Sequence, residues 1–293
     1  MKYRVTHITR YAGDQPVSIC HNEAWLQPRN LPRQQCGPYE LTISPAPSYQ
    51  TSRQDYFGNH VAMFSFYQGY EGLVVTSKSE VTVTPRVGTL PFVPAWEMVR
   101  DRLSAHADPQ SMSAYEFVFE SPRIRQTGEV AAYARESFAP GRPLLEAVGD
   151  LTARIHRDFE YKPFSSTVTT AVDEVFRNRK GVCQDFAHLQ IAALRGMGLA
   201  ARYVSGYLRT YPAAGKPRMV GADASLAWLS VYAGDAGWID VDPTNNIFPS
   251  HEHITVAFGR DYGDVCPLKG VYIGGGRHAL TVNVEVTPLG EIS

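Results

Sequence analysis

One cysteine, Cys183, precedes a segment that is typical of a buried helix. Gly181 permits a sharp turn just before it, and Gly196 and Gly198 are suited to ending the helix. The apolar positions have helical spacing with few polar breaks: Phe186, Leu189, Ile191, Ala193, Leu194 and Met197. Free N–H groups and the helix dipole at an N-terminus lower the pKa of a thiol and favour the nucleophilic thiolate. The pattern therefore indicates thiol chemistry, and a small buried core cysteine is the alternative.

Two later segments form a predicted hairpin. Residues 226–232 and 238–241 have the pattern of strands, and Gly234-Asp235-Ala236-Gly237 provides the turn between them. Trp228 and Trp238 are expected to pack on this hairpin. Side chains on successive strands approach one another, so Leu226 and Asp242 are expected to lie near each other.

The segments 181–189, 200–208, 221–228 and 237–245 together resemble the bacterial transglutaminase-like cysteine peptidase family. This resemblance implies a papain-like core that carries a Cys-His-Asp triad. Cys183 matches the nucleophile, and Asp242, within Asp-Pro-Thr, matches the acid that orients the histidine. The family reads Ser-His-Ala-Trp where this chain reads Ser225-Leu226-Ala227-Trp228, so Leu226 occupies the position of the histidine.

Acyl transfer needs each member of such a triad. A thiolate attacks a carbonyl, a base holds and returns the proton, and a carboxylate fixes the tautomer of the base. The backbone N–H of Cys183 is the expected first oxyanion donor, and Gln184 and Tyr161 are candidates for the second. Leucine cannot carry a proton, and losing the base from such a unit raises the barrier by roughly 5–8 kcal/mol.

Other histidines could replace the missing base. His188 is predicted to point away from the thiol, because five residues turn an α-helix by about 140° beyond one full turn. His251 and His253 could fold back toward Asp242, and His278 has no predictable position. His251-Glu252-His253 fits an exposed polar segment better than a metal site. Structural roles are favoured over site roles for four further carboxylates: Asp223, Asp240, Asp261 and Asp264.

The expected fold class is α+β, with an N-terminal antiparallel β-sandwich before a papain-like, transglutaminase-like core. We predict the sandwich at residues 1–86, a connecting segment at 87–143 that packs on both parts, and the core with the C-terminal strand at 144–293. Short β-rich runs separated by turn residues, including Ala12-Gly13-Asp14, support the sandwich. Helices are predicted at 129–138, 144–156 and 172–177, a strand at 202–208, a loop at 210–222 and a last strand at 281–286.

Composition excludes several classes of function. The 28 basic and 29 acidic residues of this 293-residue chain form no block of like charge, so we expect neither nucleic acid nor a membrane as a partner. The absence of a signal-like segment and the four irregularly spaced cysteines favour a cytoplasmic protein with free thiols. No motif implies a cofactor or a metal. The predicted function is thiol acyl transfer on a peptide or protein amide at Cys183, with activity in doubt because of Leu226. The alternative is a non-catalytic protein that binds a peptide or protein in the same cleft.

Overall fold

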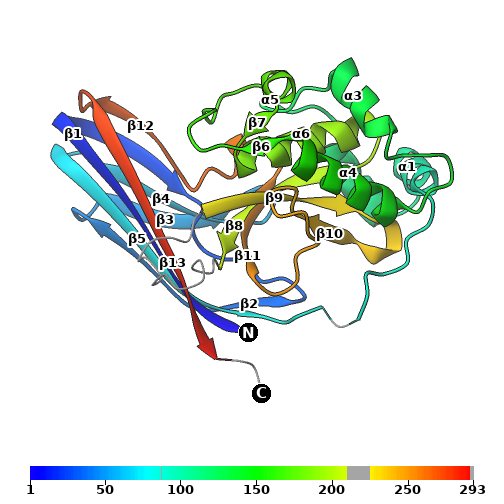
Figure 1. The fold of residues 1–293 in the computed structure, drawn as a ribbon. Coiled ribbons are helices and arrows are strands. Elements are labelled where there is room, and N and C mark those ends of the chain that lie inside the picture. Colours follow the sequence, from blue (N-terminus) through cyan, green and yellow to red (C-terminus); the bar gives the residue numbers. More distant parts are fainter. Residues whose placement is uncertain (87, 210–224, 291–293) are drawn as a thin grey trace, which may run out of the picture.

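The computed structural model describes residues 1–86, 88–209 and 225–290. It confirms the α+β class: an antiparallel sheet built from the N-terminal strands packs against a core in which helices cover one face of a second sheet (Figure 1). Within these residues no helix is long and apolar enough to cross a bilayer.

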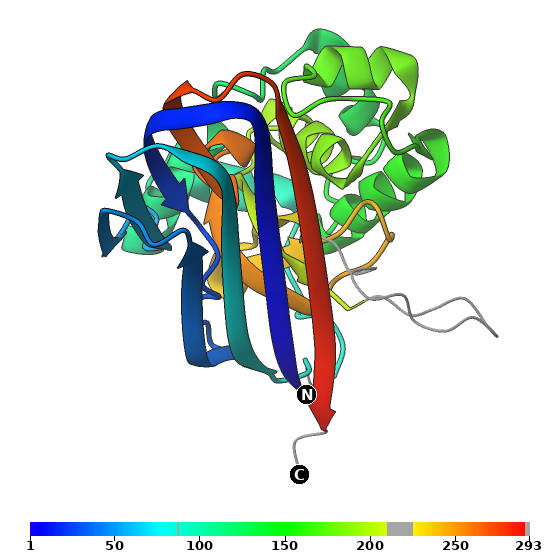
Figure 2. The ribbon, with the colours of Figure 1, turned by 90° about the vertical axis from the view of Figure 1, so that its left-hand side faces the viewer.

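The first sheet has seven strands and folds over on itself. Its main order is β2-β5-β1-β4-β3, with bounds β1 Lys2–Ala24, β2 Gln34–Ser44, β3 Tyr49–Gln54, β4 His60–Phe66 and β5 Tyr70–Val83. The first half of β1 pairs with β5, and the second half pairs with β4. The turn predicted at Ala12-Gly13-Asp14 is therefore wrong: β1 continues through it, with a register shift between Ala12 and Val17 that accompanies its bend (Figure 2). The two layers of the expected sandwich belong to one sheet, which encloses a small apolar cluster that includes Phe64, Phe66 and Val75.

The last two strands complete the first sheet and not the core. β12 (Leu268–Gly274) and β13 (His278–Gly290) both pair antiparallel with β1. Figure 2 shows β13, in red, beside the blue β1 on the outer layer. The prediction that the C-terminal strand belongs to the core was therefore wrong, because alternation identifies a strand but does not name its partner. The division of the chain at residues 86 and 143 stays a prediction.

Helices fill much of the connecting segment. α1 (Trp96–Ser104) buries Trp96, Val99 and Leu103, whose spacing of three and four residues defines one helical face. The other helices that precede the cysteine segment are α2 Pro109–Tyr115, the 3₁₀ turn η1 Glu116–Val118, α3 Gly128–Arg135, α4 Leu144–Asp158 and α5 Val172–Asn178. All of the α-helices contribute buried side chains to the main apolar cluster, which also receives Tyr3 and Val5 from β1. The segment from Trp96 onward is therefore built into the core.

The core sheet has the order β10-β9-β8-β11, and all of its pairs are antiparallel. Its strands are β8 Ala201–Leu208, β9 Ser225–Tyr232, β10 Trp238–Val241 and β11 His253–Gly259, with 3₁₀ turns η2 Gly234–Ala236 and η3 Tyr262–Asp264. A short parallel pair, β6 (Glu160–Tyr161) and β7 (Lys180–Gly181), leads into α6 (Cys183–Gly196). The predicted hairpin is confirmed. The predicted loop at 210–222 lies outside the described residues.

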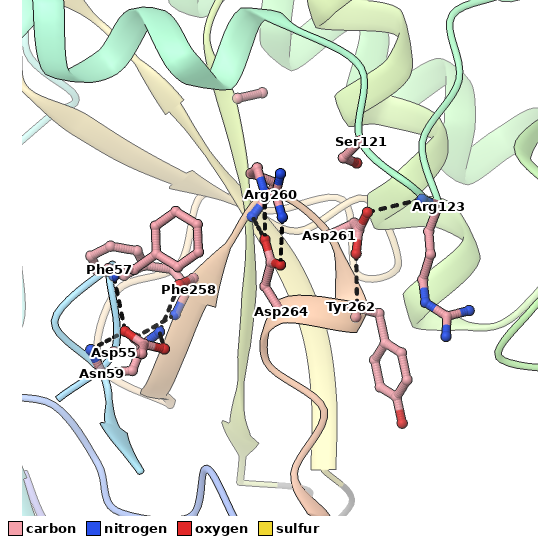
Figure 3. A network of polar contacts seen from close by, with 12 residues as sticks. Asp55, Phe57, Asn59, Ser121, Arg123, Phe258, Arg260, Asp261, Tyr262 and Asp264 are labelled. Atoms are coloured by element: carbon pink, nitrogen blue, oxygen red, sulfur yellow. Dashed lines mark hydrogen bonds and ion pairs between the residues drawn. The ribbon is translucent and has the colours of Figure 1, made fainter. Parts of the chain in front are cut away.

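Side chains of the N-terminal part satisfy the free edge of β11. The Asn59 side chain donates to the carbonyl of Phe258 (2.9 Å) and accepts from its N–H (3.0 Å), as a neighbouring strand would (Figure 3). Gln34 does the same at Thr255, with distances of 2.7 and 2.8 Å. Asp55 holds Asn59 in place through its backbone and its side chain. These bonds cap an edge strand that would otherwise expose unpaired backbone groups.

A buried histidine links the two sheets and makes folding sensitive to acid. His7 on β1 is hydrogen-bonded to Tyr207 of β8 (3.0 Å) and to Thr9 (2.9 Å). Burial lowers the pKa of His7 from 6.5 to about 4. The unfolded chain therefore binds a proton that the folded chain does not, and stability that is complete above pH 6.5 is lost as the pH falls toward 4.

We expect this group to cost about 3 kcal/mol of unfolding free energy between pH 6.5 and 4. His7→Gln should reduce that pH dependence by a similar amount, measured by urea unfolding at several pH values. His156→Gln, which removes an exposed histidine, should keep the wild-type dependence. Equal pH dependence in all three proteins would contradict the assignment.

Candidate active site

Helix α6 places Cys183 at its first residue and is buried from Gln184 to Arg195. Just before the thiol, the Asp185 carboxylate accepts a hydrogen bond from the backbone N–H of Val182 (2.8 Å) and another from the Ser166 hydroxyl. At the other end, the Arg195 guanidinium donates to the carbonyls of Phe117, Ala201 and Arg260. The helix is therefore fixed at both ends, and the thiol lies where the sequence predicted.

The electrostatic prediction for this thiol was wrong. The pKa of Cys183 is raised from 9.0 to about 11, mainly by burial, and the nearby carboxylates Asp242 and Asp185 act in the same direction. Hydrogen bonds from the backbone N–H groups of Ala227 and Gln184 act in the opposite direction but do not offset burial. With a pKa of about 11, only about one Cys183 thiol in ten thousand is ionised at pH 7, despite its position at the helix terminus.

Asp242 lies directly after β10, close enough for its charge to act on Cys183. Its carboxylate is buried and accepts four hydrogen bonds. Oδ1 accepts from the N–H groups of Thr244 (2.9 Å) and Asn245 (3.1 Å), and Oδ2 accepts from the Asn245 amide (2.7 Å). The fourth partner is His253, with 2.9 Å between Nε2 and Oδ2. The carboxylate is thus satisfied without a histidine at position 226.

Leu226 is half-buried on β9, opposite Gly206 of β8. Strand alternation puts its side chain on the same face as Trp228. The Trp228 ring crosses Gly206 so closely that a Cβ there would lie 2.3 Å from the indole. β9 pairs with β10 up to Leu229 and Val241, which puts Leu226 and Asp242 at neighbouring strand ends, and a contact between their side chains stays a prediction.

None of the alternative histidines is shown to serve the thiol. His188 accepts the N–H of Tyr262 (3.1 Å) and packs on Tyr203, and burial lowers its pKa to about 3. His253, one of the two histidines expected to be able to fold back toward Asp242, is hydrogen-bonded to that carboxylate. Its ring meets Trp228 edge-on at 4.9 Å, and its Nδ1 is buried with no partner among the described residues. The side chain of His278 lies outside the described part.

The two candidates for the second oxyanion donor, Tyr161 and Gln184, have different surroundings. Tyr161 pairs with Gly181 across β6 and β7, is half exposed, and interacts with the charge of Cys183. The Gln184 amide instead donates to the carbonyl of Val168 (3.3 Å), which leaves Tyr161 as the candidate for the second oxyanion donor.

Three of the four further carboxylates have hydrogen-bond partners. Asp261 accepts from the N–H groups of Arg123 and Gly263, and Asp264 pairs with Arg260 (Figure 3). The structural reading of Asp261 and Asp264 is therefore confirmed. Asp240 accepts from Ser230. Asp223 lies outside the described residues.

Comparison with known proteins identifies the family. Residues 131–243 match the transglutaminase-like superfamily, and residues 3–82 match the bacterial transglutaminase-like N-terminal region. The chain belongs to the transglutaminase-like superfamily.

Several relatives match nearly the whole chain. An uncharacterized protein of Mycobacterium tuberculosis is 42% identical over 296 residues, covering 98% of this chain and 93% of that one. One of Mycobacterium leprae is 34% identical over 293 residues, covering 98% and 99%. The crystal structure of a candidate cysteine protease from Cytophaga hutchinsonii superposes with a TM-score of 0.76 at 20% identity, covering 100% of this chain and 92% of that one. It shows that the fold is shared.

A shorter match falls on a named enzyme. A protein-glutamine gamma-glutamyltransferase of Pseudomonas aeruginosa is 32% identical over 107 residues, which is 34% of this chain and 16% of that protein. The match supports membership of the transglutaminase-like superfamily.

The turn before the thiol makes a testable prediction. A Cβ on Gly181 would lie 2.8 Å from both Cβ and Oδ2 of Asp185, the residue that anchors the start of α6. We expect Gly181→Ala to lower the free energy of unfolding by about 1–3 kcal/mol, measured by urea unfolding. Gly128→Ala is the matched control, because a Cβ there meets nothing within 4 Å. Equal stability of the two variants would show that this contact does not constrain the site.

Proposed function

We propose that this protein binds a peptide or protein amide at Cys183 and that acyl transfer through this thiol is strongly attenuated by Leu226. The observation that carries the proposal is the arrangement around the thiol. Cys183 begins the buried helix α6, hydrogen-bonds the backbone of Ala227 on β9 and lies within the field of Asp242. The family's motif would have its nucleophile at Cys183 and its acid at Asp242, with Leu226 at the position of its histidine.

The missing imidazole affects every step that moves a proton. The Cys183 thiol would have to lose its proton before Sγ attacks the amide carbon, and the C–N bond would have to break with a proton delivered to the leaving amine. Water or a second amine would then release the acyl group from sulfur and would itself need a base. The side chain of Leu226 can neither accept nor donate a proton in any of these steps. The backbone N–H of Cys183 and the Tyr161 hydroxyl are the groups that we assign to the developing oxyanion.

A second role, binding without turnover, is favoured by a different observation. The Asp242 carboxylate already has four donors, one of which is the imidazole of His253. A site whose acid is fully satisfied has no structural requirement for a histidine at position 226. Such a cleft could hold a peptide or protein segment with Leu226 as an apolar part of its surface.

Because all four cysteines are free, we place the protein in the cytoplasm.

Restoring the imidazole distinguishes the two roles. We expect Leu226→His to raise the rate of amide turnover by at least about a hundredfold, because a positioned general base typically contributes that much. The measurement is ammonia release and amine incorporation with glutamine-containing peptides, together with hydrolysis of a panel of peptide amides.

Two controls separate base catalysis from other effects of the substitution. Leu226→Asn introduces a polar side chain of similar size without a base and should stay at the wild-type rate. Cys183→Ala in the Leu226→His background should abolish the gain. If Leu226→His folds but turns over nothing on this panel, the attenuated enzyme is excluded and the binding role stands.

A further inference from the structure

A cleft lined by three arginines lies on the side of the core sheet that faces away from α6. Its volume is about 620 Å³, and it lies between the connecting segment after β5 and the strands β10 and β11. Tyr203 on β8 packs against His188 of α6, so alternation along the strand directs its neighbour Arg202 to the opposite face, into the cleft. This cleft is therefore distinct from the surroundings of Cys183.

Arg202 is held by two aromatic rings, with no polar partner among the described residues. Its guanidinium carbon lies 3.6 Å from the centre of the Phe258 ring and 4.2 Å from that of Trp238. No hydrogen bond or ion pair reaches this guanidinium from residues 1–86, 88–209 or 225–290, and its Nε is buried and unsatisfied. Stacking on two rings fixes the plane of the group and leaves its N–H donors unused. A guanidinium in this state is suited to a bidentate acceptor.

Two more arginines line the same cleft. Arg33 donates only to the backbone carbonyls of Thr84 (3.5 Å) and Ser250 (3.3 Å), and no carboxylate among the described residues lies within 4.0 Å of Arg33 or Arg86. Burial lowers the pKa of Arg86, and the charge of Arg33 lowers it further. The charge of Asp240 acts in the opposite direction but does not offset these two effects.

The cleft contains one carboxylate and one unused imidazole nitrogen. Asp240 accepts a hydrogen bond from Ser230. Its one negative charge cannot neutralise the three guanidinium groups that also line the cleft. His253 also lines the cleft; its side chain is 3% exposed, and its Nδ1 has no partner in the described part of the chain. A buried polar atom without a partner is costly unless a ligand or water completes it.

From these contacts we propose that the cleft is a binding site for a small anion with two or more negative charges, held by Arg33, Arg86 and Arg202. The ligand chemistry is a group of oxygen acceptors, either on phosphates or on several carboxylates. Planar guanidinium forks match both. Because His253 also bonds to Asp242, an occupied cleft would contact the same histidine that satisfies the acid near Cys183.

Binding can be measured directly on the full chain. Isothermal titration calorimetry with pyrophosphate and with citrate, at constant ionic strength, should give saturable binding, and acetate should give none. Saturation by pyrophosphate alone assigns the site to phosphates, and saturation by citrate alone assigns it to carboxylates. Trp238 fluorescence should change with the same midpoint, because this ring stacks on Arg202.

Arginine variants test whether this cleft is the site. We expect Arg86→Gln and Arg202→Gln each to weaken binding at least tenfold. Arg10→Gln, which removes an exposed arginine of β1, should leave the affinity unchanged. Arg86 is half-buried and lies three residues after the end of β5, so its variant keeps the test valid if Arg202→Gln fails to fold. The proposal is overturned if the wild-type chain binds neither anion more tightly than acetate, or if Arg86→Gln binds as tightly as the wild type.

Discussion

The burial of helix α6 is the constraint on which the site depends. Side chains from Gln184 to Arg195 are removed from solvent on all sides, so the helix cannot shift without disturbing the main apolar cluster. The cost of burying Arg195 is offset by hydrogen bonds to carbonyls from three separate segments of the chain. A thiol at the first residue of such a helix has a fixed position relative to β9, and the chemistry open to Cys183 follows from that position.

The same burial accounts for the inertness that we infer for Cys183. A helix N-terminus favours a thiolate only where water or a counter-charge also supports it, and here burial dominates. In a complete triad an imidazolium would supply that counter-charge. Leu226 supplies none, and Asp242 adds a negative charge that disfavours the thiolate further. The absence of one imidazole therefore reverses the effect of an otherwise favourable geometry.

The sequence predicted what depends on local pattern. The bounds of α6 and of β10 and the hairpin followed from spacing, turn residues and strand alternation. The bend of β1 did not, because glycine and aspartate permit a turn without requiring one. The pairing of β13 with β1 joins segments far apart in the chain, so single-sequence periodicity carries no information about it.

We propose that Cys183 is a nucleophile at a helix terminus that lacks only its imidazole. The most direct test is the rate of Cys183 alkylation as a function of pH, read by peptide mass spectrometry in the wild type and in Leu226→His. We expect the wild-type rate to rise until about pH 11, and the variant to reach its plateau at least two pH units lower, because a neighbouring imidazolium stabilises the thiolate. Identical profiles in the two proteins, or a wild-type thiol that is already ionised at neutral pH, would contradict it.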